Sequence, residues 1–125
     1  MDKIQSLKGM IDLIANRSDP DDFAESIFRT EDALKNIFVN FGYSEIRTPV
    51  LEDADLFKRS VGDSSDIVNK ELYSFLDKNE KNITLRPENT AGVIRSVIEK
   101  KIDVNTHKFW YLGPMWRYER PQKGR

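Results

Sequence analysis

Residues 107–125 read HKFWYLGPMWRYERPQKGR, and no other stretch of the 125-residue chain is as informative. The aromatic run from Phe109 to Trp116 predicts a strand that opens into a basic, glycine-containing loop. The stretch holds five basic residues and one acidic residue and so carries +4, whereas residues 1–106 carry −5 of a whole-chain charge of −1. Guanidinium groups at the end of a stiff strand are rigid, forked donors of the kind that bind a polyphosphate. A solvated basic tail is the plainer alternative, but disordered tails avoid aromatic residues.

Length and composition favour a single domain over residues 1–125. Hydrophobic residues make up 38% of the chain, and a domain of this size buries roughly two-thirds of its unfolded surface. The chain has no cysteine and one histidine, His107, which excludes disulfides, thiolate catalysis and a histidine-based metal cluster. We predict no metal site. No apolar run approaches the ~20 residues of a membrane span, and the N-terminus lacks the apolar stretch of a signal peptide.

The hydrophobic periodicity predicts three helical and four extended segments. In order, they are a helix over about 21–40 that starts from a cap at 18–21, a strand over 43–51, a short helix with a loop over 52–69, a hairpin formed by 72–75 and 83–85, a helix over about 89–101 and a strand over 109–116. Gly42 is a suitable stop for the first helix. Neighbouring strands with helices to one side predict an α+β fold with a mainly antiparallel sheet and flanking helices.

A first polar segment, residues 86–92, reads RPENTAG. Pro87 marks the exit from a strand, and Glu88 and Thr90 lie where the next helix begins. Two interpretations stay open for this segment. Glu88 is either an acid that caps the first turn of the helix, or a carboxylate that holds an ammonium group with the Thr90 hydroxyl beside it.

A second polar pair, Arg117 and Glu119, has the spacing that puts two side chains on one face of a strand. A cation next to a phosphate at ~4 Å contributes about 4 kcal/mol at an effective dielectric near 20. An exposed arginine–glutamate pair on a sheet contributes less than about 1 kcal/mol. We expect Arg117, Glu119 and Glu88 to share one concave face.

The string WRYE at 116–119 resembles the second signature motif of class II aminoacyl-tRNA synthetases. Together with RPENTAG, the longer string GPMWRYERPQKGR is similar to the histidyl-tRNA synthetase family. The resemblance covers nearly all of the chain, with the first motif over about 21–49 and the second over about 107–125. It implies a partial class II catalytic fold whose second motif is incomplete. Asn89 stands where the family usually has glycine, so the turn beside it is expected to differ.

The resemblance implies a reaction and its partners. The full enzyme activates histidine with ATP to histidyl-adenylate and transfers the histidyl group to tRNA(His). Mg²⁺ would bridge the phosphates, the protein would form a homodimer, and its location would be the cytoplasm, with no membrane partner. We expect the present chain alone to be inactive or very weakly active.

The resemblance also implies roles for five residues. Arg117 would be the catalytic arginine that grips the α-phosphate of ATP. Glu119 would contact the nucleotide, and Arg125 would approach the outer phosphates. Glu88 would bind the α-ammonium of histidine, with Thr90 beside it.

Three alternatives remain beside this assignment. One is a catalytically idle paralogue that regulates histidine biosynthesis, and it should not keep Arg117, Glu119 and the basic loop together. Another is a non-catalytic folded fragment that acts only as a dimerisation or weak nucleotide-binding module. The last is an RNA-binding domain that stacks bases on Trp110, Tyr111 and Trp116, although aromatic residues at strand spacing usually belong to a core.

Overall fold

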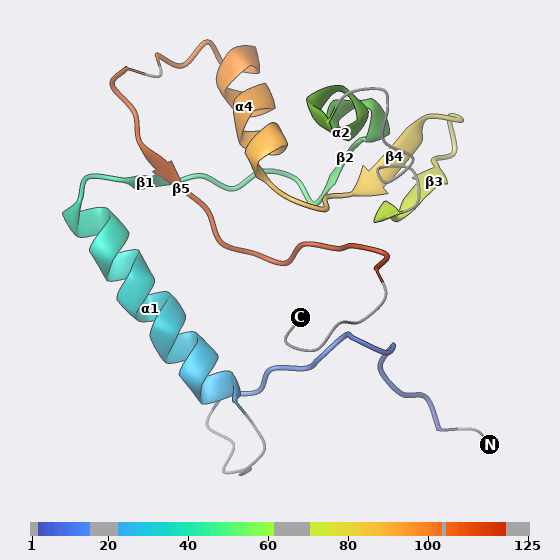
Figure 1. The fold of residues 1–125 in the computed structure, drawn as a ribbon, viewed down its shortest axis with the longest axis horizontal. Coiled ribbons are helices and arrows are strands. Elements are labelled where there is room, and N and C mark those ends of the chain that lie inside the picture. The colour runs from blue at the N-terminus through green and yellow to red at the C-terminus, as the bar shows by residue number, and fades with distance from the viewer. Residues whose placement is uncertain (1–2, 16–22, 62–70, 104, 120–125) are drawn as a thin grey trace. The chain divides into compact units, whose positions relative to one another are not determined.

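The structure is a computed structural model with two compact units (Figure 1). It describes residues 3–15, 23–61, 71–103 and 105–119. One unit contains helix α1 (Ala24–Asn40), and the other spans Tyr43–Arg120. The organisation of residues 1–125 as a single domain stays a prediction.

Helix α1 forms where the apolar residues recur at spacings of three and four. It ends where Gly42 adopts a φ of +76°, a left-handed conformation that glycine tolerates without a side-chain clash. The amide of Gly42 donates to the carbonyl of Val39 at 3.0 Å, which closes the last turn. The stop predicted at Gly42 is therefore confirmed. The cap predicted at residues 18–21 lies outside the described residues.

Three short strands form an antiparallel sheet in the second unit. They are β2 (Leu51–Asp53), β4 (Asn82–Leu85) and β3 (Ser74–Leu76), in the spatial order β2-β4-β3. The β3–β4 hairpin is closed by Asp77, whose carboxylate accepts hydrogen bonds from the amides of Asn79 and Lys81. The predicted hairpin is therefore confirmed.

A second, parallel pair joins distant parts of the chain. Strand β1 (Ser44–Glu45) pairs with β5 (Phe109–Trp110). The single strand predicted over 43–51 is therefore wrong, because its two ends belong to different sheets. Pro49 lies between them and has no amide hydrogen to donate to a ladder.

The strand predicted over 109–116 is also shorter than expected. Only its first two residues form a strand, and residues 111–119 have no regular secondary structure. Gly113 and Pro114 interrupt the aromatic run, and both residue types are depleted within strands.

Two helices cover one face of the antiparallel sheet. Helix α2 (Ala54–Val61) packs against α4 (Thr90–Glu99) and against β2 and β4 (Figure 1). Phe57 of α2 is 2% exposed, and the covered face of the sheet carries the paired residues Glu52 and Thr84. The α+β class with flanking helices is therefore confirmed. Among the described helices, none has the length and apolar character needed to cross a membrane.

Because Phe57 is buried, its truncation should destabilise the protein. We expect Phe57→Ala to lower the free energy of unfolding by about 3 kcal/mol, because it leaves a cavity under α2. Phe75→Ala removes a ring that is 49% exposed and should lower it by less than about 1 kcal/mol. Urea denaturation of both variants measures the difference, and equal losses would contradict the core position of Phe57.

Candidate functional site

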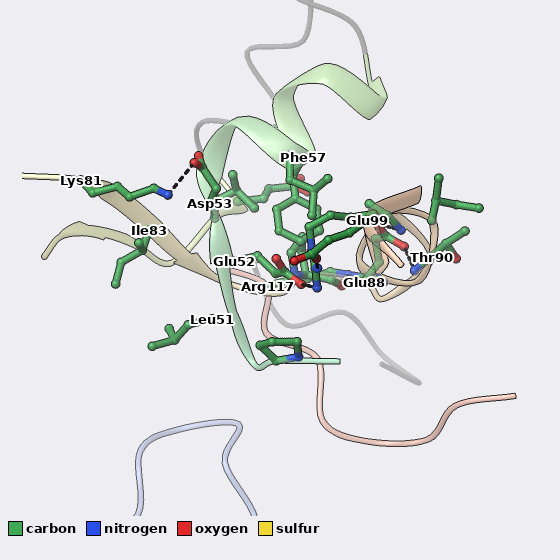
Figure 2. A pocket seen from close by; sticks show the side chains of 18 of the residues that line it. Leu51, Glu52, Asp53, Phe57, Lys81, Ile83, Glu88, Thr90, Glu99 and Arg117 are labelled. Carbon is green, nitrogen blue, oxygen red and sulfur yellow. Dashed lines mark hydrogen bonds and ion pairs between the residues drawn. The ribbon is translucent and has the colours of Figure 1, made fainter. Parts of the chain in front are cut away.

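An open cavity of about 1450 Å³ lies within the second unit (Figure 2). Its walls come from β2, α2, β4, α4 and the segment after β5. Four of the five site residues predicted from the sequence line this cavity: Glu88, Thr90, Arg117 and Glu119. The expected concave face is therefore present. The fifth residue, Arg125, lies outside the described residues.

The buried side chain of Arg86 holds the wall of the cavity together. It is 6% exposed, and its guanidinium donates to the carbonyl of Pro114 at 3.2 Å and to that of Thr48 at 3.1 Å. Its backbone amide donates to Val50, and its backbone carbonyl accepts from Trp116, each at 3.0 Å. One residue therefore joins the segment before β2, the end of β4 and the segment after β5.

Gly113 leaves room for this guanidinium. A Cβ atom at residue 113 would lie 2.6 Å from Nη2 of Arg86. That distance is well inside van der Waals contact, so a side chain at this position would displace the guanidinium. A residue without a side chain is therefore needed at this position for Arg86 to pack.

Asn89 belongs to the same buried group. It precedes α4, where asparagine commonly caps a helix, but it makes no capping bond. It is 3% exposed, and its Oδ1 accepts from the Thr48 hydroxyl at 2.5 Å and from Nη1 of Arg86 at 3.4 Å. The Asn89 side chain therefore faces the interior.

Glu88 caps α4 in place of Asn89. One carboxylate oxygen accepts from the amide of Thr90 at 2.5 Å, and the other accepts from the amide of Ala91 at 3.1 Å. The capping interpretation of Glu88 is therefore confirmed. It does not exclude the second interpretation, because each carboxylate oxygen keeps a lone pair for another donor. The two amides fix the carboxylate at the edge of the cavity.

The hydroxyl of Thr90 lies 2.9 Å from the phenol oxygen of Tyr111. The sequence pattern predicts Tyr111 only as an aromatic platform or a core residue. The contact joins residues 21 positions apart, so no local spacing could have predicted it. Tyr111 is the residue near the site that sequence reasoning missed.

Arg117 reaches the cavity without being part of a strand. Its Nε donates to the carbonyl of Pro87 at 2.9 Å, next to Glu88. The strand predicted at residues 117 and 119 is absent, so strand alternation does not explain why both side chains line the cavity. The bond from the Trp116 amide to Arg86 places Arg117 instead. Within the described part of the chain, the four N–H donors of its two terminal nitrogens have no partner.

Arg117 also differs in charge balance from the other cations around the cavity. Lys81 pairs with Asp53 at 3.2 Å, and Arg95 pairs with Glu52 at 2.8 Å and with Glu99 at 2.6 Å. Across the described ranges, Arg117 has no ion pair. It is therefore the cation of this cavity whose charge no described carboxylate balances.

The hydrogen bond to Glu52 raises the pKa of Arg95, and the charges of Glu52 and Glu99 add to this effect while burial opposes it. The Arg95 guanidinium therefore stays charged and stays committed to its acidic partners.

The described residues include no group of three histidine, aspartate or glutamate side chains that could hold a metal ion. Mg²⁺ is commonly held by one or two carboxylates together with substrate phosphates. The Mg²⁺ that the family resemblance implies therefore stays a prediction.

Comparisons with known proteins agree on one family. The family model described as histidyl-tRNA synthetase matches residues 18–125. The chain is 51% identical to a histidine–tRNA ligase of a Nitratiruptor species, covering 98% of this chain and 29% of that protein. It is 48% identical to a histidine–tRNA ligase of Legionella pneumophila (strain Lens), covering 100% of this chain and 28% of that protein.

A solved structure shows the same likeness. The crystal structure of apo S. aureus histidyl-tRNA synthetase matches with a TM-score of 0.70 and 36% sequence identity, covering 93% of this chain and 30% of that chain. The chain thus spans less than a third of the length of the curated relatives it matches.

Because the Arg86 guanidinium joins separate segments, its replacement should destabilise the protein. We expect Arg86→Lys to lower the free energy of unfolding by about 2 kcal/mol, because a compact ammonium cannot reach the carbonyls of Pro114 and Thr48 together. The matched control is Arg47→Lys, whose side chain is 82% exposed beside Glu45. It should change the stability by less than about 0.5 kcal/mol. Urea denaturation that shows the same loss for both variants would argue against the anchoring role.

Proposed function

Because the chain belongs to the histidyl-tRNA synthetase family, we propose that it forms the part of a histidine–tRNA ligase site that holds the α-ammonium of histidine and the α-phosphate of ATP. One observation carries the proposal. The fixed carboxylate of Glu88 and the unbalanced guanidinium of Arg117 line one cavity and are linked through the carbonyl of Pro87. The relatives are much longer, so the complete reaction with ATP, histidine and tRNA(His) is part of the proposal.

Arg117 would act on the charge that develops during activation. A carboxylate oxygen of histidine attacks the α-phosphorus, a new P–O bond forms, and the bond to the β-phosphate breaks as pyrophosphate leaves with the electron pair. Negative charge grows on the α-phosphoryl oxygens. The bond from Nε to Pro87 holds the guanidinium in place beforehand, and such preorganised donors stabilise a transition state without reorganisation.

Glu88 and Thr90 would bind the amino group of histidine. The positive end of the α4 dipole by itself disfavours an ammonium, and the Glu88 carboxylate offsets this effect. The Thr90 hydroxyl supplies a second oxygen beside it. An ammonium held at this point leaves the carboxylate of the amino acid free to face the phosphate beside Arg117.

The remaining contacts follow the same assignment. Glu119, which lines the cavity, would contact the nucleotide, and Arg125 would approach its outer phosphates. Mg²⁺ would accompany ATP and neutralise the leaving pyrophosphate. We place the protein in the cytoplasm, as a homodimer that acts on tRNA(His).

A second candidate function is an association module that binds nucleotide weakly or not at all. The observation that favours it is an apolar stripe along α1 and its C-cap. Leu34 and Ile37 of α1 are 39% and 49% exposed, and the C-cap residue Phe41 is 71% exposed. Sedimentation velocity detects such association. A dimer that binds no ATP supports this candidate over the first.

The role of Arg117 predicts a change in nucleotide affinity. We expect Arg117→Ala to weaken binding of Mg·ATP by at least about tenfold, because charge-assisted hydrogen bonds contribute ~1.5–3 kcal/mol. Arg47→Ala removes another exposed arginine away from the cavity and should leave the affinity unchanged. Calorimetric titration of the chain compares the variants. Absence of saturable binding, or equal weakening by both substitutions, would contradict the phosphate role.

The role of Glu88 predicts a change in ligand selectivity. L-histidine and 3-(imidazol-4-yl)propionate differ only in the amino group. We expect Glu88→Gln to reduce the preference for histidine by about tenfold, because the charge that attracts the ammonium is lost while the shape is kept. Glu45→Gln serves as the control. An NMR titration that finds the same preference in the Glu88 variant would remove Glu88 from the ammonium site.

A further inference from the structure

We infer that Tyr111 is a positioning residue, whose phenol holds the hydroxyl of Thr90 where the α-ammonium of the amino acid is recognised. The inference rests on the function proposed for Glu88 and Thr90. Its starting point is the distance of 2.9 Å between the two hydroxyl oxygens. Tyr111 is not among the residues that line the cavity, so it acts through Thr90 and not on the ligand.

Thr90 depends on an outside partner because of its place in the helix. A helical threonine commonly donates to a carbonyl in the preceding turn and divides between two rotamers. Thr30 of α1 does so, with its hydroxyl 2.7 Å from the carbonyl of Ser26. Thr90 is the first residue of α4 and has no preceding turn. Its hydroxyl therefore takes the partner that another segment offers.

The backbone next to Tyr111 is fixed by strand pairing. It follows Trp110, which is 7% exposed and belongs to the β1–β5 pair. The amide of Ile46 donates to the carbonyl of Trp110 at 3.0 Å. The phenol therefore extends from a backbone that pairing fixes on one side.

The contact leaves Thr90 able to accept a further bond. If the phenol donates, one lone pair of the Thr90 oxygen stays free, and if the threonine donates, both stay free. The Thr90 amide is already tied to Glu88. With both its amide and its hydroxyl engaged, Thr90 would present a fixed oxygen near the Glu88 carboxylate. An ammonium has three donors and could bond to both groups.

The first test needs no ligand. Three-bond couplings between the backbone and Cγ2 report the χ1 rotamer of Thr90 in the chain by NMR. We expect one rotamer in the unaltered chain and averaging between rotamers in Tyr111→Phe, which removes only the phenol oxygen. Tyr118→Phe is the matched control, because the Tyr118 side chain packs on Tyr73, and it should leave the couplings unchanged. An unchanged Thr90 rotamer in Tyr111→Phe would overturn the inference.

The second test asks whether Tyr111 acts through Thr90 on selectivity. We expect Tyr111→Phe to reduce the preference for L-histidine over 3-(imidazol-4-yl)propionate by about fivefold and to leave Mg·ATP affinity unchanged. In a Thr90→Val background the same substitution should have no further effect. An additive loss in the double variant would overturn the inference. If the Thr90 rotamer responds as expected but the unaltered chain and its variants all bind the two ligands equally, the positioning role of Tyr111 holds and the proposed function fails.

Discussion

The buried guanidinium of Arg86 is the constraint on which the cavity depends. Burying a charge is costly unless hydrogen bonds compensate for the lost water. Within the described ranges, Arg86 has neutral oxygen partners only, and they come from Thr48, Asn89 and Pro114. Those partners must stay in place for the charge to remain buried. The three segments are therefore held as one unit, and Glu88 and Arg117 lie on two of them.

The described cations of the cavity and its wall differ in their partners. Three of them have partners within the protein, whereas Arg117 keeps donors that could bind a ligand. Arg95 and Lys81 form ion pairs with acidic neighbours, and Arg86 is buried. Among the residues that the structure describes, Arg117 makes one hydrogen bond, from Nε to the neutral carbonyl of Pro87. An activation reaction that builds charge on a phosphoryl group needs a donor with this kind of spare capacity. On the carboxylate side, the same two hydrogen bonds that cap α4 also orient Glu88.

Local patterns predicted the elements that depend on neighbouring residues. The β3–β4 hairpin, the stop at Gly42 and the helix after Glu88 follow from alternation, backbone freedom and capping. The strand over 109–116 was overestimated, because the aromatic pattern outweighed the interruption at Gly113. The β1–β5 pair and the contact between Thr90 and Tyr111 join distant segments, and no local signal encodes them. The residue roles and the expectation of a shared concave face rest on residue pattern and family resemblance, whereas the hydrogen bonds that build the cavity come from the structure alone.

The parallel β1–β5 pair has a consequence for how the protein is made. Ser44 pairs with Phe109, so β1 is synthesised 65 residues before its partner. At the usual pace of translation, roughly 3 to 13 seconds separate the two. The hairpin and α4 can form on the nascent chain during that interval, whereas β1 cannot. Tyr111 and Arg117 are synthesised later still. Glu88 and Thr90 therefore leave the ribosome before the residues that complete the cavity.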